Sequence, residues 1–100
     1  MLKINKTTDA GKVNISLEGR LDTVTSPELE AELKETMDGI SELTLDFAAL
    51  DYVSSAGLRV LLAAQKTMMN QGTMKIVNVN EVVMEIFEVT GFTNILKIEP

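Results

Sequence analysis

Two adjacent serines, Ser54 and Ser55, are the residues of this sequence best placed to do chemistry. They follow a segment that alternates like a strand and precede a segment with helical periodicity, so they lie where a helix begins. The backbone N–H groups of a first helical turn have no partner within the helix and favour negative charge. A hydroxyl there either caps the helix or is available for reaction. Gly57 in the same turn costs roughly 1 kcal/mol relative to alanine, which indicates that something approaches the backbone closely.

Most other chemistries lack the residues they need. The chain contains no histidine and no cysteine, so a serine hydrolase triad and the usual imidazole or thiolate metal sites cannot be assembled. It also lacks the glycine-rich motifs that cradle phosphates. Asp46 and Asp51 would need a cleft that a small domain rarely supplies to act as a catalytic carboxylate pair. We therefore expect no enzyme activity, no catalytic residue, no cofactor and no metal.

Length and composition limit the remaining possibilities. One hundred residues, 45% hydrophobic and 24% charged, fit a single soluble domain over residues 1–100. The net charge is −6, and the nine Lys and Arg residues are spread thinly, which argues against nucleic-acid binding. The chain has neither an apolar run long enough to span a bilayer nor the apolar region of a signal peptide. These features favour a cytoplasmic protein with no direct contact to nucleic acid and no membrane insertion.

Hydrophobic periodicity predicts the elements that position the serines. In chain order these are strands near residues 2–4 and 13–17, a helix from 25 or 26 to 39, a strand at 41–47, a helix at 58–71, a strand at 74–79 and a helix at 81–90. Residues 94–98 fit either a last strand or a packed tail. The order β-β-α-β-α-β-α-(β) predicts an α/β fold with a mixed sheet of four to five strands and helices mainly on one face.

The three predicted helices carry details that a structure can test. The first begins either with a capping box formed by Thr25 and Glu28 or with Ser26 as the N-cap before Pro27. The buried stripe predicted for the second consists of Leu58, Leu61, Leu62, Gln65 and Met69. The residues that the third is expected to bury are Val82, Val83, Ile86 and Phe87.

Three segments resemble the motifs of one bacterial family. Residues 52–59, YVSSAGLR, closely resemble the signature of the STAS domain of anti-sigma factor antagonists, also called anti-anti-sigma factors. Residues 19–22, GRLD, resemble a second motif of the family, and residues 83–91, VMEIFEVTG, resemble its third helix and closing glycine. The three motifs occur in the family's order and extend over nearly the whole chain. The resemblance implies a STAS fold.

The resemblance also implies a function in partner switching. Such a protein binds an anti-sigma factor serine kinase, which has a histidine-kinase-like ATPase fold, and thereby frees a sigma factor for transcription. The kinase ends the binding by phosphorylating a serine, and a PP2C-type phosphatase restores it. Matching Gly57-Leu58 to the family's Gly-Leu places the phosphorylated residue at Ser55. Ser54, where the family often has aspartate, is the alternative acceptor, and a helix cap is the alternative role for Ser55.

Asp22 matches the family's loop aspartate, which lies near the acceptor. The partner-binding surface implied by the resemblance consists of Asp22, Thr23, Tyr52, Val53, Ser54, Ser55, Ala56, Gly57 and Arg59. Two other functions remain open. The chain could be a STAS accessory or scaffold subunit that is not phosphorylated, for example in a lipid-transport complex, or a STAS domain that senses a small ligand or nucleotide.

Overall fold

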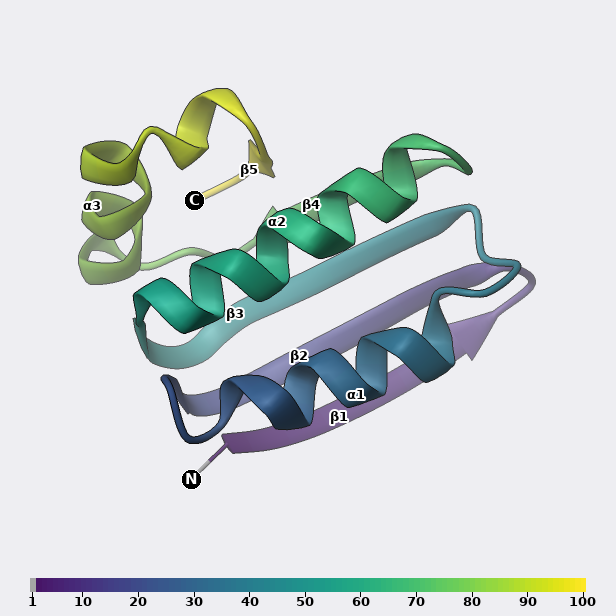
Figure 1. Cartoon of the computed structure of the whole chain (residues 1–100), viewed down its shortest axis with the longest axis horizontal. Helices are drawn as coiled ribbons and strands as arrows, with labels where there is room; N and C mark the ends of the chain where they lie inside the picture. Colours follow the sequence, from purple (N-terminus) through teal and green to yellow (C-terminus); the bar gives the residue numbers. More distant parts are fainter. Residues whose placement is uncertain (1) are drawn as a thin grey trace.

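The computed structural model describes residues 2–100 as five strands, three α-helices and one 3-10 helix (Figure 1). In chain order they are β1 (Leu2–Asp9), β2 (Lys12–Leu21), α1 (Ser26–Thr36), β3 (Glu42–Val53), α2 (Ser55–Met69), β4 (Thr73–Val77), α3 (Glu81–Thr90), η1 (Phe92–Asn94) and β5 (Lys97–Ile98). The predicted element order is confirmed. The undecided last segment forms both the short η1 helix and the two-residue strand β5.

The five strands form one mixed sheet in the order β1-β2-β3-β4-β5. β1 and β2 pair antiparallel, as expected for a hairpin, and every later pair is parallel. Each parallel connection passes through a helix, so β2, β3 and β4 all end at the same edge of the sheet. Figure 1 shows α1 and α2 side by side in front of the sheet, both beginning at that edge. The two turns that lead into these helices are therefore neighbours.

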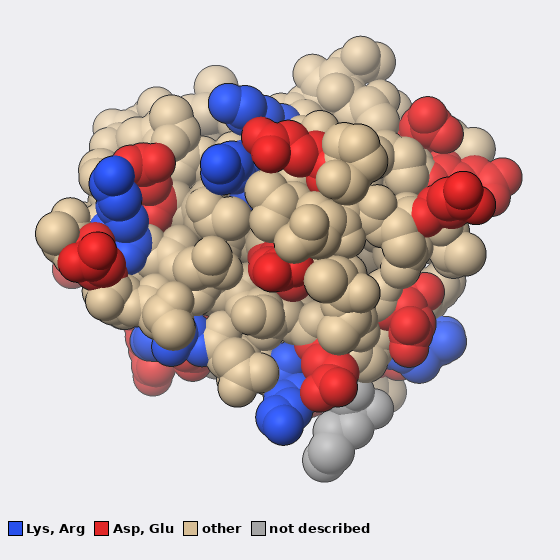
Figure 2. Space-filling view, turned by 180° about the vertical axis from the view of Figure 1, so that it is seen from behind, with Lys and Arg blue, Asp and Glu red and all other residues tan. Residues whose placement is uncertain are grey.

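Buried apolar residues alternate with more exposed polar residues along the central strands, so the sheet has one covered face and one open face. The inward residues of β2 and β3, namely Val13, Ile15, Leu17, Leu43, Leu45 and Phe47, are all buried. The residues between them, Asn14, Ser16, Thr44 and Asp46, are exposed or half-buried. Figure 2 shows the molecule from behind, and the acidic and basic side chains on this side are interspersed without a continuous basic patch. The predicted placement of the helices on one face is confirmed.

The third helix packs against the far end of β3. The ring of its Phe87 stacks on Phe47 with centroids 6.2 Å apart, and neither residue is accessible to solvent. Asn80 joins the start of α3 to the sheet, because its Oδ1 accepts from Val83 N at 2.9 Å and its Nδ2 donates to Leu50 O at 2.8 Å. This arrangement extends the core beyond the end of β4.

Several helix details differ from the sequence-based prediction. The buried residues of α2 are Gly57, Leu58, Val60, Leu61, Ala64 and Met68, whereas Met69, predicted to be buried, is 70% exposed. In α3, Val82 is exposed. Neither predicted cap forms at α1, since Thr25 occupies the N-cap position but its side chain does not cap the helix. The buried stripe of α1 includes Leu29 and Leu33.

No helix within residues 2–100 is both long enough and apolar enough to cross a membrane.

Candidate functional site

The first part of the site is the turn that follows β2. Two register shifts in the pairing of β2 with β3 each place one extra residue in β3 opposite the second half of β2, and Gly19 of β2 has a φ of 109°, which L side chains rarely adopt. The pairing continues past both shifts to Leu21, which lies beside Val53 and is completely buried. The chain then leaves the core at Asp22. The glycine of the GRLD segment thus supplies a positive φ within β2, two residues before the strand ends.

The carboxylate of Asp22 holds this turn together. Its Oδ1 accepts from the backbone N–H groups of Val24 and Thr25, both at 3.0 Å, and from the Thr25 hydroxyl at 3.2 Å. The hydrogen bond from the Thr25 N–H is the main reason why the pKa of Asp22 is lowered, and Arg20, whose Nε lies 4.0 Å from Oδ2, contributes in the same direction. The Asp22 carboxylate therefore stabilises the conformation of the turn through these hydrogen bonds.

Thr25 completes the same network. Its Oγ1 accepts from Asp22 N at 2.9 Å and donates to Arg20 O at 2.7 Å. Because this side chain turns back toward β2, it is not available to cap α1. The helix is instead tied to the turn by Ser26 N, which donates to Asp22 O at 2.8 Å.

The second part of the site is the junction between β3 and α2. Ser54 is extended there, with φ −89° and ψ 175°, and it is the N-cap of α2. Its Oγ accepts from Gly57 N at 3.3 Å, and its carbonyl oxygen accepts from Leu58 N at 2.9 Å. Ser54 is half-buried, and its side chain has a structural task. The predicted alternative that Ser55 is the cap is wrong, because the helix begins one residue earlier than that role requires.

Ser55 differs from its neighbour in every one of these respects. It is the first residue of α2, it is exposed, and within residues 2–100 its hydroxyl has no hydrogen-bond partner. The first turn of α2 contains no acidic residue that would repel an added negative charge. Of the two serines, Ser55 is the one whose oxygen is free to react.

Leu21 joins the two turns into one surface. Its carbonyl oxygen accepts from Ser54 N at 2.8 Å. Gly57 packs directly over it, since a Cβ built on Gly57 would lie 2.8 Å from Leu21 Cγ and 3.1 Å from Leu21 O. The sequence predicted that some group approaches the backbone at Gly57, and that group is Leu21, the last residue of β2. The turn after Leu21 and the turn at Ser55 are thus held side by side.

The remaining predicted surface residues fall into two groups. Thr23 and Arg59 are exposed and Ala56 is half-buried, and all three line an open hollow of about 230 Å³ between the starts of α1 and α2. Val53 and Gly57 are buried, so they support the exposed residues of this surface and are not themselves accessible to a partner in this conformation.

Tyr52 lies at the end of β3 beside the β2 turn. It is half-buried, and the guanidinium of Arg20 sits over its ring at 4.5 Å from the centroid. This cation–π contact connects the last residues of β2 and β3. Arg20 thereby touches both Tyr52 and the Asp22 carboxylate.

Sequence reasoning missed one prominent residue of this surface. Val24, in the middle of the Asp22 turn, is 81% exposed, more than any other large hydrophobic residue among those described. The signal available in the sequence was an apolar residue inside the short polar run that follows GRLD.

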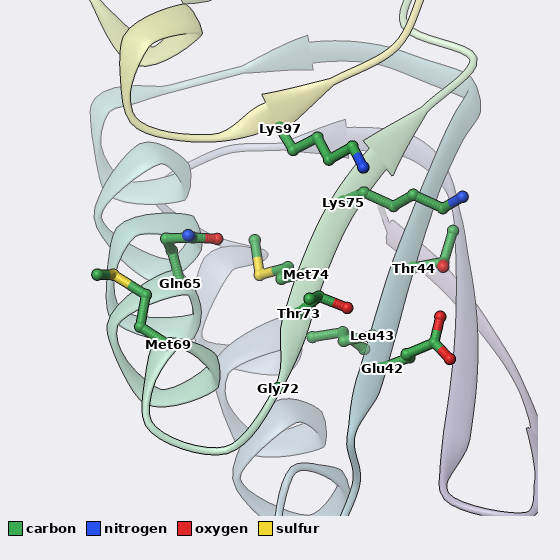
Figure 3. A pocket seen from close by; sticks show the side chains of 10 residues that line it. All are labelled: Glu42, Leu43, Thr44, Gln65, Met69, Gly72, Thr73, Met74, Lys75 and Lys97. Carbon is green, nitrogen blue, oxygen red and sulfur yellow. The ribbon is translucent and has the colours of Figure 1, made fainter.

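A separate pocket of about 250 Å³ lies near the opposite edge of the sheet (Figure 3). Residues 42–44 of β3, residues 72–75, Gln65 and Met69 of α2, and Lys97 line it. Gln65 Oε1 is buried there without a hydrogen-bond partner within residues 2–100, and Figure 3 shows the amines of Lys75 and Lys97 directed away from Gln65, on the other side of β4. Ser55 lies at the other end of α2, so this pocket is distinct from the serine turn. Among residues 2–100, no cluster of three or more acidic side chains is placed to hold a metal ion.

Comparisons with protein families and with known proteins both match most of the chain. The family described as "STAS domain" matches residues 3–100. The putative anti-sigma factor antagonist BtrV of Bordetella bronchiseptica is 38% identical over 90 residues, which cover 88% of this chain and 78% of that protein.

Solved structures share the fold. An anti-sigma factor antagonist from Mycobacterium paratuberculosis has a TM-score of 0.91 at 22% identity, covering 100% of this chain and 86% of that one. The Bacillus cell fate determinant SpoIIAA, solved in its phosphorylated form, has a TM-score of 0.74 at 16% identity, covering 96% of this chain and 90% of that one.

Proposed function

The chain belongs to the STAS domain family, and from this premise we propose that it is an anti-sigma factor antagonist switched by phosphorylation of Ser55. Unmodified, it binds an anti-sigma factor serine kinase of the histidine-kinase-like ATPase fold in the cytoplasm and frees a sigma factor. The kinase transfers the γ-phosphoryl group of ATP to the Ser55 hydroxyl, which ends the binding. A PP2C-type phosphatase hydrolyses the phosphoserine and restores it. The names of the curated relatives support the antagonist function.

The observation that carries the proposal is the division of tasks between the two serines. Ser54 uses its side chain to cap α2 and its backbone N–H to bind Leu21 O. Ser55 is exposed, and its oxygen is not used in the fold. A kinase can therefore reach Ser55 without unfolding the helix. Reaching the Ser54 oxygen would break the cap first.

The same position explains how one modification changes binding without destroying the fold. A phosphoserine carries about −1.5 to −2 charges, and a helix N-terminus stabilises such charge by about 0.3–1 kcal/mol. The structural cost to this domain is therefore small. An interface built for a neutral hydroxyl must instead desolvate an unpaired dianion, which costs several kcal/mol.

Mass spectrometry of phosphorylated variants tests the assignment. The unmodified chain is incubated with ATP and, in turn, with each anti-sigma factor kinase encoded in the source genome. One added phosphoryl group is expected on the wild type and on Ser54→Ala, and none on Ser55→Ala. Phosphate on Ser55→Ala but not on Ser54→Ala would move the acceptor to Ser54. Binding to a kinase without phosphorylation of any variant would support the accessory or scaffold function.

Stability measurements provide a control for these variants. Ser54→Ala removes an N-cap and should lower the free energy of unfolding by about 1 kcal/mol. Ser55→Ala removes an exposed hydroxyl that makes no hydrogen bond within residues 2–100 and should stay within about 0.5 kcal/mol of the wild type. The phosphorylation result is interpretable because Ser54→Ala, the less stable variant, is the one expected to be modified.

One observation favours a second function, the sensing of a small ligand. The pocket around Gln65 contains a buried acceptor without a donor, together with Lys75 and Lys97, which could attract an anionic group (Figure 3). A nucleotide supplies both a donor and a negative charge. Titration with ATP, ADP and GTP, followed by thermal unfolding of the wild type and of Gln65→Ala, tests this function. A saturable rise in the unfolding temperature that Gln65→Ala abolishes would support it.

A further inference from the structure

We propose that Val24 is the apolar anchor by which the protein partner of the Ser55 turn recognises this chain. The inference deepens the proposed function and rests on it. The partner is a protein whose binding site presents an apolar depression to Val24 beside the group that reaches the Ser55 hydroxyl. Asp22 then acts on binding by positioning Val24.

The exposure of Val24 does not by itself indicate a contact, because single exposed apolar residues are common on protein surfaces. Val89 in α3 is nearly as exposed, at 77% against 81% for Val24. What sets Val24 apart is the turn that carries it and the place where that turn lies. Val89 therefore serves as a matched control.

The turn is held in one conformation by its own hydrogen bonds. Asp22 Oδ1 accepts from the Val24 N–H and from the Thr25 N–H, and the Thr25 hydroxyl bonds to Arg20 O and Asp22 N. Val24 itself contributes no buried side chain to the fold. A loop that is already ordered pays little conformational entropy on binding, so an apolar side chain fixed in this way suits an interface anchor.

The position of the turn puts Val24 on the same surface as Ser55. Leu21, two residues before Thr23, accepts from Ser54 N and lies beneath Gly57. The hollow lined by Thr23, Ala56 and Arg59 occupies the space between the two turns. Val24 follows the lining residue Thr23, and Ser55 precedes the lining residue Ala56, so a partner that covers the hollow comes within one residue of both. Side chains that fill a desolvated pocket, ringed by contacts that exclude water, carry much of the affinity in protein interfaces.

The test uses Val24→Thr and Val89→Thr, which each replace one exposed methyl group by a hydroxyl. The probe is the purified anti-sigma factor kinase that binds the wild type, and the measured quantity is the dissociation constant of each variant. Val24→Thr should bind at least about tenfold more weakly, because the hydroxyl is desolvated without a partner. Val89→Thr should stay within about twofold of the wild type, and both variants should unfold at the wild-type temperature.

The possible outcomes distinguish failure of the Val24 anchor from failure of the proposed antagonist function. Equal binding by Val24→Thr and Val89→Thr, to a kinase that binds the wild type, would overturn the anchor while leaving the antagonist function intact. Failure of the wild type to bind any of the kinases would overturn the proposed function and the anchor with it.

The positioning role of Asp22 is tested by two substitutions at that residue. Asp22→Asn keeps an oxygen that can accept from the Val24 N–H, whereas Asp22→Ala removes it. We expect Asp22→Asn to bind within about threefold of the wild type and Asp22→Ala to lose at least about tenfold. Equal losses in both variants would show that the partner contacts the charge directly, and would overturn the positioning role.

Discussion

Replacing Gly57 by alanine should destabilise the domain, although helix propensity alone predicts the opposite. Alanine within a helix is favoured over glycine by about 1 kcal/mol. The added Cβ, however, would lie 2.8 Å from Leu21 Cγ, 3.0 Å from Leu21 Cδ2 and 3.1 Å from Leu21 O. Unstrained carbon contacts lie at about 3.5–4.0 Å. Leu21 is completely buried and its carbonyl holds Ser54 N, so it has little room to move.

The magnitude follows from the balance of these two effects. Overpacking in a well-filled core costs about 1–3 kcal/mol, and propensity returns at most about 1 kcal/mol. A contact of 2.8 Å lies well inside the unstrained range, so the upper part of that cost applies, and the net loss for Gly57→Ala is about 1–2 kcal/mol. For a domain of this size such a loss lowers the unfolding temperature by up to about 15 °C, at roughly 4–8 °C per kcal/mol. Urea unfolding, monitored by circular dichroism, measures the free energy directly.

A control within the same helix separates packing from propensity. Ala63 is exposed on α2, so Ala63→Gly measures what glycine costs in this helix without a change in packing. If propensity governed position 57, then Gly57→Ala would gain about what Ala63→Gly loses. A Gly57→Ala variant as stable as the wild type, or more stable, would refute the close packing of α2 against the end of β2.

Three further predictions concern positions whose roles are set by individual contacts. Gly72→Ala should lower the free energy of unfolding by at least about 2 kcal/mol in urea titrations, because a Cβ there would clash with the backbone carbonyl of Ser41. Wild-type stability would contradict the close approach of these two loops. Asn80→Ala should cost about 1–2 kcal/mol, since it removes the N-cap of α3 and the bond to Leu50 O, and full stability in the same assay would show that neither matters. The lowered pKa of Asp22 stabilises the fold above the ordinary carboxyl pKa, and this contribution is lost as the pH falls through the folded-state pKa. When the pH is lowered from 5 to about 3, the unfolding temperature of Asp22→Asn should therefore fall less than that of the wild type. An equal fall in both proteins would contradict the stabilising role of the Asp22 charge.

The sequence was sufficient to predict the strands and helices whose hydrophobic residues recur with a clear period. Alternation in β2 and β3 placed Ile15 and Leu45 in the core, and the change to helical periodicity located the turn at Ser55. The phase of α2 was misjudged for a physical reason. Leucine, valine and alanine fill almost every position from residue 60 to 64, so several stripes fit, and packing against the sheet selects the one that ends at Met68 instead of Met69.

The sequence predicted both turns that the structure brings together at Leu21, but not the tasks of their side chains. The choice between Ser54 and Ser55 as helix cap depends on a boundary of one residue, which propensity does not resolve. The role of Asp22 depends on hydrogen bonds to backbone groups of Val24 and Thr25, which appear only when the turn is built. The burial of Val53 follows from the bulges that let β3 continue to that residue.

The central claim is that a phosphoryl group on Ser55 abolishes binding to the anti-sigma factor kinase while the fold persists. The most direct measurement compares the dissociation constants of the unmodified chain and the chain carrying phosphoserine at position 55, with Ser55→Ala and Ser55→Asp in parallel. We expect the phosphorylated chain to bind at least about a hundredfold more weakly, Ser55→Asp to be partly impaired and Ser55→Ala to bind like the wild type. Binding of the phosphorylated chain with unchanged affinity would contradict the account.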